Sequence, residues 1–219
     1  MLYNNDIIVF DFETGGVNPK VCPAIQIAGL VIDSRRLEPY PDGVFSSMMR
    51  PPDNEMPLIG QKALDINKKT IKEIEEAPAQ KEVWENFSKF VKKFSKGRGF
   101  YNNLIPAGKY IRGFDLIISE RLCRSYGPWD KTDDCQDLFH RKVILDADDM
   151  LYMWFEGTTD ELKNLKMDTI KPYLGMKGDS ITKGHDALQD VKDTAAIIIK
   201  FLKLHRGLFP KIKFRNSFA

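Results

Sequence analysis

The sequence predicts one α/β domain, a mixed sheet with helices on its faces. Two observations lead to this prediction. Apolar, β-branched runs separated by turn residues fill the first 50 positions, and later segments repeat apolar residues every three or four positions. The resulting order is β-β-β-α-β-α-β-α-α, without an internal repeat or a low-complexity linker. We expect residues 1–219 to form a single domain with a basic C-terminal extension at about 206–219.

Three strands are expected first. The continuous apolar run at 7–10 is typical of a strand buried on both faces. A second strand is predicted at 24–32, bent at Gly29, and a third at 44–49. Turn residues at 15–16 and 39–43 would join them into a meander.

Helical periodicity then dominates. The apolar positions of the first long helix are Val83, Trp84, Phe87, Phe90, Val91 and Phe94. Short strands are expected at 104–107 and 143–145, and helices at 116–122 and 150–155. One or two further helices would end at Gly175, and a strong amphipathic helix over 187–202 would close the domain.

The composition is that of a soluble globular protein, with 42% hydrophobic and 29% charged residues. No stretch approaches the roughly 20 apolar residues of a membrane span, and the first residues lack the pattern of a secretory signal. Three cysteines, without metal-binding spacing, do not suit a fully paired disulfide framework. We therefore expect an intracellular, cytoplasmic protein that does not engage a membrane.

Charge is unevenly distributed along a chain whose net charge is only +2. Acids concentrate at 130–160, whereas 200–219 and 89–98 are basic. Basic segments can attract a polyanion, but solvated helix faces explain them equally well. Charge alone therefore decides nothing about the partner.

A pair of acids ends the first predicted strand. In a strand, residues i and i+2 project to the same face, so Asp11 and Glu13 would lie side by side. Two adjacent carboxylates suit a hard divalent cation, and the glycines that follow permit close backbone approach. The same spacing recurs at Asp53 and Glu55, but in a loop. Only the pair at Asp11 ends a buried strand, where an acid is costly without compensation.

A histidine and an acid open the last predicted helix. His185 follows a glycine-rich loop, and Asp190 lies about one helical turn further on. An imidazole can accept a proton from water at neutral pH. Taken alone, the pair is better explained as a capping segment, with Asp186 in the first turn and Asp193 on the solvated surface.

Other acids have simpler explanations when taken one at a time. Asp115 would cap the helix that starts at 116. The acids Asp146, Asp148 and Asp149 cluster at a strand end, where turn and cap chemistry accounts for them, although they could bind a metal.

Together, the order of these motifs resembles that of the DEDDh branch of the DnaQ-like 3′–5′ exonucleases. The resemblance spans about residues 6–205 and rests on the segments 10–15 and 185–190 and on Phe114-Asp115. The segment 63–67 is similar to the one that lies against the terminal nucleotide in that family. The resemblance implies an RNase H-like mixed β-sheet flanked by α-helices.

The resemblance also implies site residues and a cofactor. Asp11, Glu13 and Asp190 would hold one Mg²⁺ or Mn²⁺, Asp11 would bridge to a second ion, and Asp115 would support that second ion. His185 would act as the general base.

Substrate contacts follow from the same resemblance. The residues expected to bind substrate are Phe12, Thr14, Gly15, Gly16, Leu64, Asn67, Lys109, Tyr110 and Arg112. The polar and glycine positions and the 64–67 segment would hold the 3′-terminal nucleotide. The aromatic rings are candidate stacking surfaces, with core packing as the alternative. The cations, with the C-terminal lysines, would contact phosphates.

The expected activity is therefore metal-dependent release of nucleoside monophosphates from the 3′ end of single-stranded or frayed DNA, with a polymerase as a candidate partner. An RNA 3′-trimming exoribonuclease or oligoribonuclease is the alternative within the same class, since no reader of the 2′-hydroxyl is visible. A non-catalytic nucleic-acid-binding module is the rival, because Tyr110-Ile111 stands where the family usually has His-Asn. An α/β domain whose acids are only caps and turns ranks last.

Overall fold

The structure is a computed structural model that describes residues 5–97, 99–157, 162–176 and 186–208. Along the chain the elements are β1 (Ile7–Thr14), β2 (Ala24–Asp33), β3 (Glu38–Met48), the 3₁₀ turn η1 (Met56–Leu58), α1 (Gln61–Asn67), α2 (Ile71–Glu75), α3 (Gln80–Lys93), η2 (Phe100–Asn102), β4 (Ile105–Gly108), α4 (Asp115–Tyr126), β5 (Trp129–Asp130), β6 (Cys135–Gln136), β7 (Leu145–Asp146), α5 (Ala147–Phe155), α6 (Met167–Tyr173) and α7 (Ala187–Leu208). The expected mixed sheet with flanking helices is confirmed.

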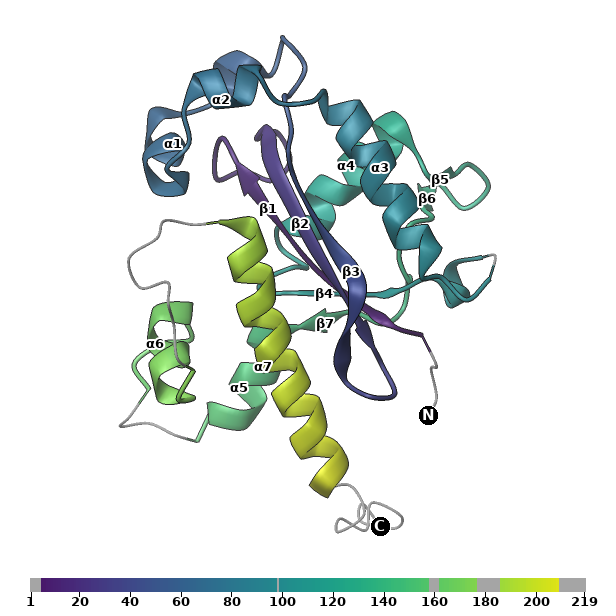
Figure 1. The fold of residues 1–219 in the computed structure, drawn as a ribbon, viewed down its shortest axis with the longest axis vertical. Helices are drawn as coiled ribbons and strands as arrows, with labels where there is room; N and C mark the ends of the chain where they lie inside the picture. Colours follow the sequence, from purple (N-terminus) through teal and green to yellow (C-terminus); the bar gives the residue numbers. More distant parts are fainter. Residues whose placement is uncertain (1–4, 98, 158–161, 177–185, 209–219) are drawn as a thin grey trace.

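The main sheet has the strand order β3-β2-β1-β4-β7, and β5 pairs only with β6 in a small separate ribbon. The meander is antiparallel from β1 to β3, whereas β4 runs parallel to β1 and β7 runs parallel to β4. β1 is the central strand, and its carboxyl end lies toward α1 and the beginning of α7 (Figure 1). That end carries the strand-end pair of acids.

The alternation of side chains along β1 supplies both hydrophobic cores. Ile8 and Phe10 pack with Trp84 and Phe87 of α3 and with residues of α4 on one face. Ile7 and Val9 pack on the other face against α7, which crosses the sheet in Figure 1. The continuous apolar run therefore marks a strand covered on both faces, as predicted.

The third strand is longer than its sequence predicts. The expected turn at 39–43 lies inside β3, and Pro39 pairs with Ile32. The actual turn occupies 34–37, where the Asp33 carboxylate accepts hydrogen bonds from the amides of Arg35 and Arg36 at 2.8 and 3.0 Å. An edge strand tolerates proline, because one side of its backbone has no partner strand to bond. The ladder is irregular between Leu30 and Ile32, just after Gly29, which itself pairs regularly with Phe45.

The predicted helices are confirmed, with small changes of boundary. Helix α2 was not predicted, because its five residues bury only Ile74. A capping box between Thr70 and Glu73 defines its start. Asp193, expected on the solvated surface, instead pairs with Lys171 and ties α6 to α7. The basic segment at 209–219 lies outside the described residues.

No helix within the described ranges combines the length and the apolar character needed to cross a bilayer.

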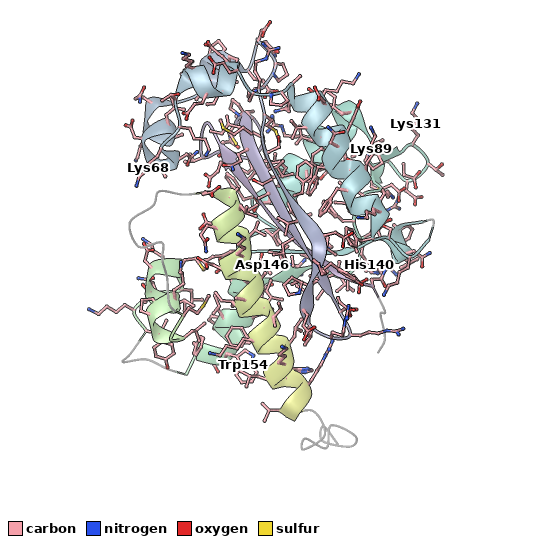
Figure 2. All side chains as sticks on the ribbon, viewed as in Figure 1. Lys68, Lys89, Lys131, His140, Asp146 and Trp154 are labelled. Carbon is pink, nitrogen blue, oxygen red and sulfur yellow. The ribbon has the colours of Figure 1, made fainter. Side chains whose placement is uncertain are left out.

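A buried histidine far from β1's carboxyl end makes stability sensitive to acid. His140, labelled in Figure 2, is 1% exposed, and its Nδ1 accepts hydrogen bonds from the amides of Lys142 and Val143 at 3.2 and 3.0 Å. Burial lowers the pKa of His140, and the Lys142 cation lowers it further. In the unfolded chain His140 has its ordinary pKa of about 6.5, so it takes up a proton at a higher pH than in the folded chain. The free energy of unfolding should therefore fall as the pH drops below about 6.5.

The matched variant is His140→Asn, whose side-chain oxygen can accept in place of Nδ1 but does not titrate. Urea unfolding at pH 7.5 and 5.5 should show a smaller loss for this variant than for the wild type. An equal loss in both proteins would assign the acid sensitivity to other groups.

Candidate active site

Two acids of the site come from β1. Asp11 and Glu13 follow Ile7 and Val9 on the face that α7 covers, because side chains two residues apart share a face. Glu13 is 7% exposed, and Asp11 is partly buried. Glu13 pairs with Gln26 across the β1–β2 ladder, next to an irregularity after Glu13. The D-x-E motif therefore places both carboxylates where the sequence predicts.

The third acid comes from the first turn of α7. The amide of Asp190 donates to the carbonyl of Asp186 at 3.0 Å, which starts the helix. Gln26 Nε2 donates to the Asp186 carboxylate at 3.1 Å and so links β2 to the beginning of α7. Gln26 was not singled out from the sequence, because a glutamine inside a strand carries no motif. Its contact helps to set the position of Asp190 relative to β1.

The structure brings these three acids together. One carboxylate oxygen from each of Asp11, Glu13 and Asp190 lies within 4.8 Å of the others. Burial raises the pKa of Asp11 well above its usual range, and the charges of Asp115, Glu13 and Asp190 raise it further. A set of oxygen donors that repel one another fits a hard divalent cation, which would neutralise them.

Asp115 differs from the prediction in its local role. It is the first residue of α4 rather than the cap, and Phe114 in the cap position makes no side-chain hydrogen bond. Its Oδ1 instead accepts a hydrogen bond from the Phe12 amide at 3.0 Å, across 103 residues of sequence. Burial raises the pKa of Asp115 to about 8, with Glu13 and Asp146 adding to the rise against hydrogen bonds from two backbone amides. A fourth acid thus lies directly beside β1.

His185, the predicted general base, lies outside the described residues, as do residues 177–184 before it. The structure begins again at Asp186, immediately before α7.

The acids lie in a cleft with a volume of about 600 Å³, which is within the usual range for a ligand site. All four described acids line it. The predicted substrate residues that line it are Phe12, Thr14, Gly15, Gly16, Asn67, Lys109 and Tyr110. Most of the predicted set thus surrounds one cleft.

Two predicted substrate residues are not in the cleft lining. Leu64 is 5% exposed and packs with Ile25 and Ile74, because the apolar face of α1 turns toward the sheet. The Arg112 guanidinium donates instead to the carbonyl of Ile144 at 3.1 Å and lies 3.6 Å from the Asp149 carboxylate. The structure therefore does not bring these two predicted residues into the cleft lining.

The two aromatic rings predicted to stack on a base differ in their exposure to solvent. The Phe12 ring is 4% exposed and packs against Phe10 and Trp84 in the core, so it offers no face to a base. Tyr110 is 60% exposed. Its ring lies over Gly113, where an added Cβ would come within 2.4 Å of a ring carbon. Glycine at 113 therefore lets Tyr110 lie flat at the rim of the cleft.

Asp146 holds the backbone beneath Tyr110. It lies at the end of β7 (labelled in Figure 2), and its carboxylate accepts hydrogen bonds from the amides of Tyr110 and Arg112 at 3.0 and 3.3 Å. It also accepts from the amide of Asp148 at 3.1 Å, as expected for a helix cap. Tyr110 has a left-handed backbone with φ of 54°. These bonds compensate for a conformation that non-glycine residues rarely adopt. The cap explanation predicted for Asp146 is confirmed.

The opposite wall joins the glycine loop, defined here as residues 15–23, to α1. The Gly60 amide donates to the carbonyl of Gly15 at 2.8 Å, and Asn67 Nδ2 donates to the carbonyl of Thr14 at 3.1 Å. A Cβ on Gly15 would lie 2.9 Å from Ile59 Cγ1, so only glycine permits this approach.

Val17, Gly60 and Lys62 also line the cleft and were not singled out from the sequence, whereas Ile66 belongs to the expected 64–67 segment. Val17 is 93% exposed, Ile66 is 47% exposed, and Lys62 lies one helical turn before Ile66 on α1. The spacing of Lys62, Ala63 and Ile66 was a usable signal, because residues three and four apart share a helix face. The sequence interpretation instead chose Leu64, whose side chain lies on the buried face of α1. Lys109 contacts Asp148 at 2.5 Å, which places one cation at the cleft.

A comparison with known protein families gives a match to the segment that carries β1. Residues 8–105 match the exonuclease family RNase_T. This segment includes Asp11, Glu13 and the glycine loop. No curated protein matches the chain.

Solved structures share the fold across nearly the whole chain. Escherichia coli exonuclease I in complex with a dT13 oligonucleotide has a TM-score of 0.71 and 16% identity, over 94% of this chain and 43% of that one. Cell-death related nuclease 4 has a TM-score of 0.68 and 16% identity, over 92% of this chain and 64% of that one. A 3′-exonuclease described with the histone mRNA stem-loop has a TM-score of 0.63 and 20% identity, over 92% and 83%. The chain thus spans less than two thirds of the first two proteins.

Proposed function

We propose that this chain is a metal-dependent 3′–5′ exonuclease, because it shares the RNase H-like fold of the DnaQ-like exonucleases and matches the exonuclease family over residues 8–105. Its substrate would be single-stranded or frayed DNA, from which it would release nucleoside monophosphates. The proposal treats residues 1–219 as one exonuclease domain. The observation that carries it is the convergence of three carboxylates in the lining of one cleft.

The residues of the site divide into metal ligands and a base. Asp11, Glu13 and Asp190 would hold one Mg²⁺ or Mn²⁺, and Asp115 would support a second with Asp11. Bound divalent ions supply charge stabilisation for both the attacking and the leaving oxygen of a phosphoryl displacement. Asp115 is oriented by the Phe12 amide, so the two sides of β1 contribute to one site. His185 would accept the proton of the attacking water.

The walls of the cleft would position the 3′-terminal nucleotide. Gly15 and Gly16 of the glycine loop line the cleft, where their backbone atoms would face the terminal nucleotide. Tyr110 offers an exposed ring on the opposite rim, suited to stacking on a base. The Lys109 ammonium group lies at the same rim and would contact a phosphate.

DNA and RNA are both represented among the proteins that share the fold. Exonuclease I was solved with a DNA oligonucleotide, and the 3′-exonuclease is described with an mRNA stem-loop. We keep DNA as the proposed substrate, with RNA 3′-trimming as the second candidate because of that mRNA-associated structure. The three cysteines are free thiols, which agrees with the proposed intracellular setting. A polymerase partner stays a prediction.

Digestion of paired DNA and RNA oligonucleotides tests the proposal. Each is labelled at the 5′ or the 3′ end and incubated with Mg²⁺, Mn²⁺ or a chelator. A 5′ label should move down a ladder of shorter products, a 3′ label should appear at once as mononucleotide, and the chelator should stop both. The relative rates on the two matched substrates decide between DNA and RNA.

Two outcomes would reject this function. An oligonucleotide that shifts on a gel but is not shortened with either metal would indicate the non-catalytic module. Release of the 5′ label first would reverse the proposed polarity. His185→Ala is expected to lose nearly all trimming, and full activity in that variant would remove His185 from the mechanism.

A further inference from the structure

Helix α4 carries an arginine whose side chain reaches the glycine loop. Arg121 Nη1 donates hydrogen bonds to the carbonyls of Pro19 and Cys22, both at 3.0 Å. Its Nη2 lies 3.7 Å from Glu55 Oε1, in the segment before α1. Resting on the proposed function, we propose that Arg121 is a positioning residue that fixes the glycine loop in the form that receives the 3′-terminal nucleotide.

The contacts of the loop explain why one side chain matters. Its first half is held by the Gly60 amide on the carbonyl of Gly15. Its middle extends into solvent at Val17, which is 93% exposed. Its second half is where Arg121 bonds the two carbonyls. Arg121 therefore anchors the side of the loop that Gly60 does not reach.

A guanidinium suits this position better than an ammonium group. One planar group bonds two carbonyls and faces one carboxylate, which requires several donors in fixed directions. The Glu55 Oε2 is buried and makes no hydrogen bond among the described residues. The Arg121 cation thus also balances a carboxylate that would otherwise be desolvated without compensation.

The same helix carries a metal-site acid and the loop anchor. Asp115 opens α4, and Arg121 follows six residues later, about 9 Å along the axis. Asp115 accepts from the Phe12 amide on one side, and Arg121 holds Pro19 and Cys22 on the other. One rigid element therefore sets the distance between the acids and the loop wall of the cleft.

Digestion by trypsin measures local opening of the glycine loop and does not require the protein to be catalytically active. Lys20 is exposed in the anchored half, and cleavage after it requires local opening. In Arg121→Ala, cleavage after Lys20 should become about tenfold faster, measured by mass spectrometry relative to cleavage after the exposed Lys131. The matched control is Arg124→Ala on the same helix, whose guanidinium lies over the Trp129 ring and is 56% exposed. That variant should cleave after Lys20 at the wild-type rate.

Kinetics then connect the loop to the substrate. Arg121→Ala should raise KM for a DNA oligonucleotide about tenfold while kcat changes less than about threefold, because loop disorder weakens substrate binding. Arg121→Lys should fall between wild type and Arg121→Ala. Added guanidinium ion at millimolar concentration should partly restore both the KM and the protease resistance of Arg121→Ala.

The protease and kinetic results test the two parts of the proposal separately. Unchanged cleavage after Lys20, in Arg121→Lys as well as in Arg121→Ala, would overturn the anchoring. Faster cleavage with an unchanged KM, or a loss confined to kcat, would overturn the positioning role. If the wild type does not trim any oligonucleotide, the proposed function fails, and the protease result still decides whether Arg121 holds the loop.

Discussion

Replacing Asp11 with asparagine is expected to reduce 3′ trimming at least about a thousandfold. The charges of Asp115, Glu13 and Asp190 all act on Asp11, so its carboxylate is coupled to each of the other acids described in the site. An amide keeps the shape of the side chain but removes the negative charge that a divalent ion requires. Initial rates on a 5′-labelled DNA oligonucleotide with saturating Mg²⁺ measure the effect.

The chain provides its own control. Asp53 and Glu55 repeat the D-x-E spacing in a loop, and Asp53 is exposed. Asp53→Asn should retain wild-type rates. Asp11→Asn should also melt no lower than the wild type in chelator, because it removes a carboxylate that burial and like charges destabilise. Trimming within tenfold of the wild-type rate would exclude Asp11 from the metal site.

The second large effect is stabilisation by metal that grows with pH. Burial raises the pKa of Asp115 to about 8, and burial also raises that of Asp11. Without metal, the folded chain therefore retains protons that the unfolded chain loses above about pH 4, and this contribution to stability is lost as pH rises toward 8. A divalent ion binds only after those protons leave, so its stabilising effect is largest at high pH.

At a Mg²⁺ concentration one hundred times its dissociation constant, the gain at pH 8 should be about 2.7 kcal/mol. For a chain of this size that corresponds to roughly 5–10 °C in melting temperature. The gain should shrink toward pH 5 and should be absent in Asp11→Asn at both values. Comparing each sample with and without metal cancels the separate acid sensitivity of His140. Equal gains at pH 5 and pH 8 would contradict the linkage.

Local patterns were enough to predict the central elements. The apolar run before Asp11 predicted a strand covered on both faces, and the period of two placed Asp11 and Glu13 on one face of it. The spacing of the apolar residues in α7 likewise placed Asp190 in the first turn. Each of these predictions depends on neighbours along the chain, where backbone geometry alone sets the direction of the side chains.

The predictions that differ from the structure concern residues whose roles depend on contacts between segments far apart in the sequence. Asp115 looks like a helix cap until β1 supplies the Phe12 amide as its partner. Pro39 looks like a turn residue until β3 proves to be an edge strand. Leu64 and Ile66 are both apolar residues of α1, and only the packing of α1 against Ile25 and Ile74 decides which of them lies in the core.

The loop anchor was also beyond the reach of sequence reasoning. Arg121 lies on a helix that also carries Arg124, and nothing in the sequence around it distinguishes the two arginines. Its role depends on two carbonyls about 100 positions away in the sequence. Tyr110 is similar, because its left-handed backbone is stabilised by Asp146 from another strand.

The central claim is that acids from β1 and α7 form one divalent-metal site, and diffraction from crystals soaked in Mn²⁺ tests it most directly. An anomalous peak should lie within about 2.3 Å of carboxylate oxygens from Asp11, Glu13 and Asp190. It should be absent from crystals of Asp11→Asn. A wild-type crystal without a peak there, at a Mn²⁺ concentration that supports trimming in solution, would contradict the account.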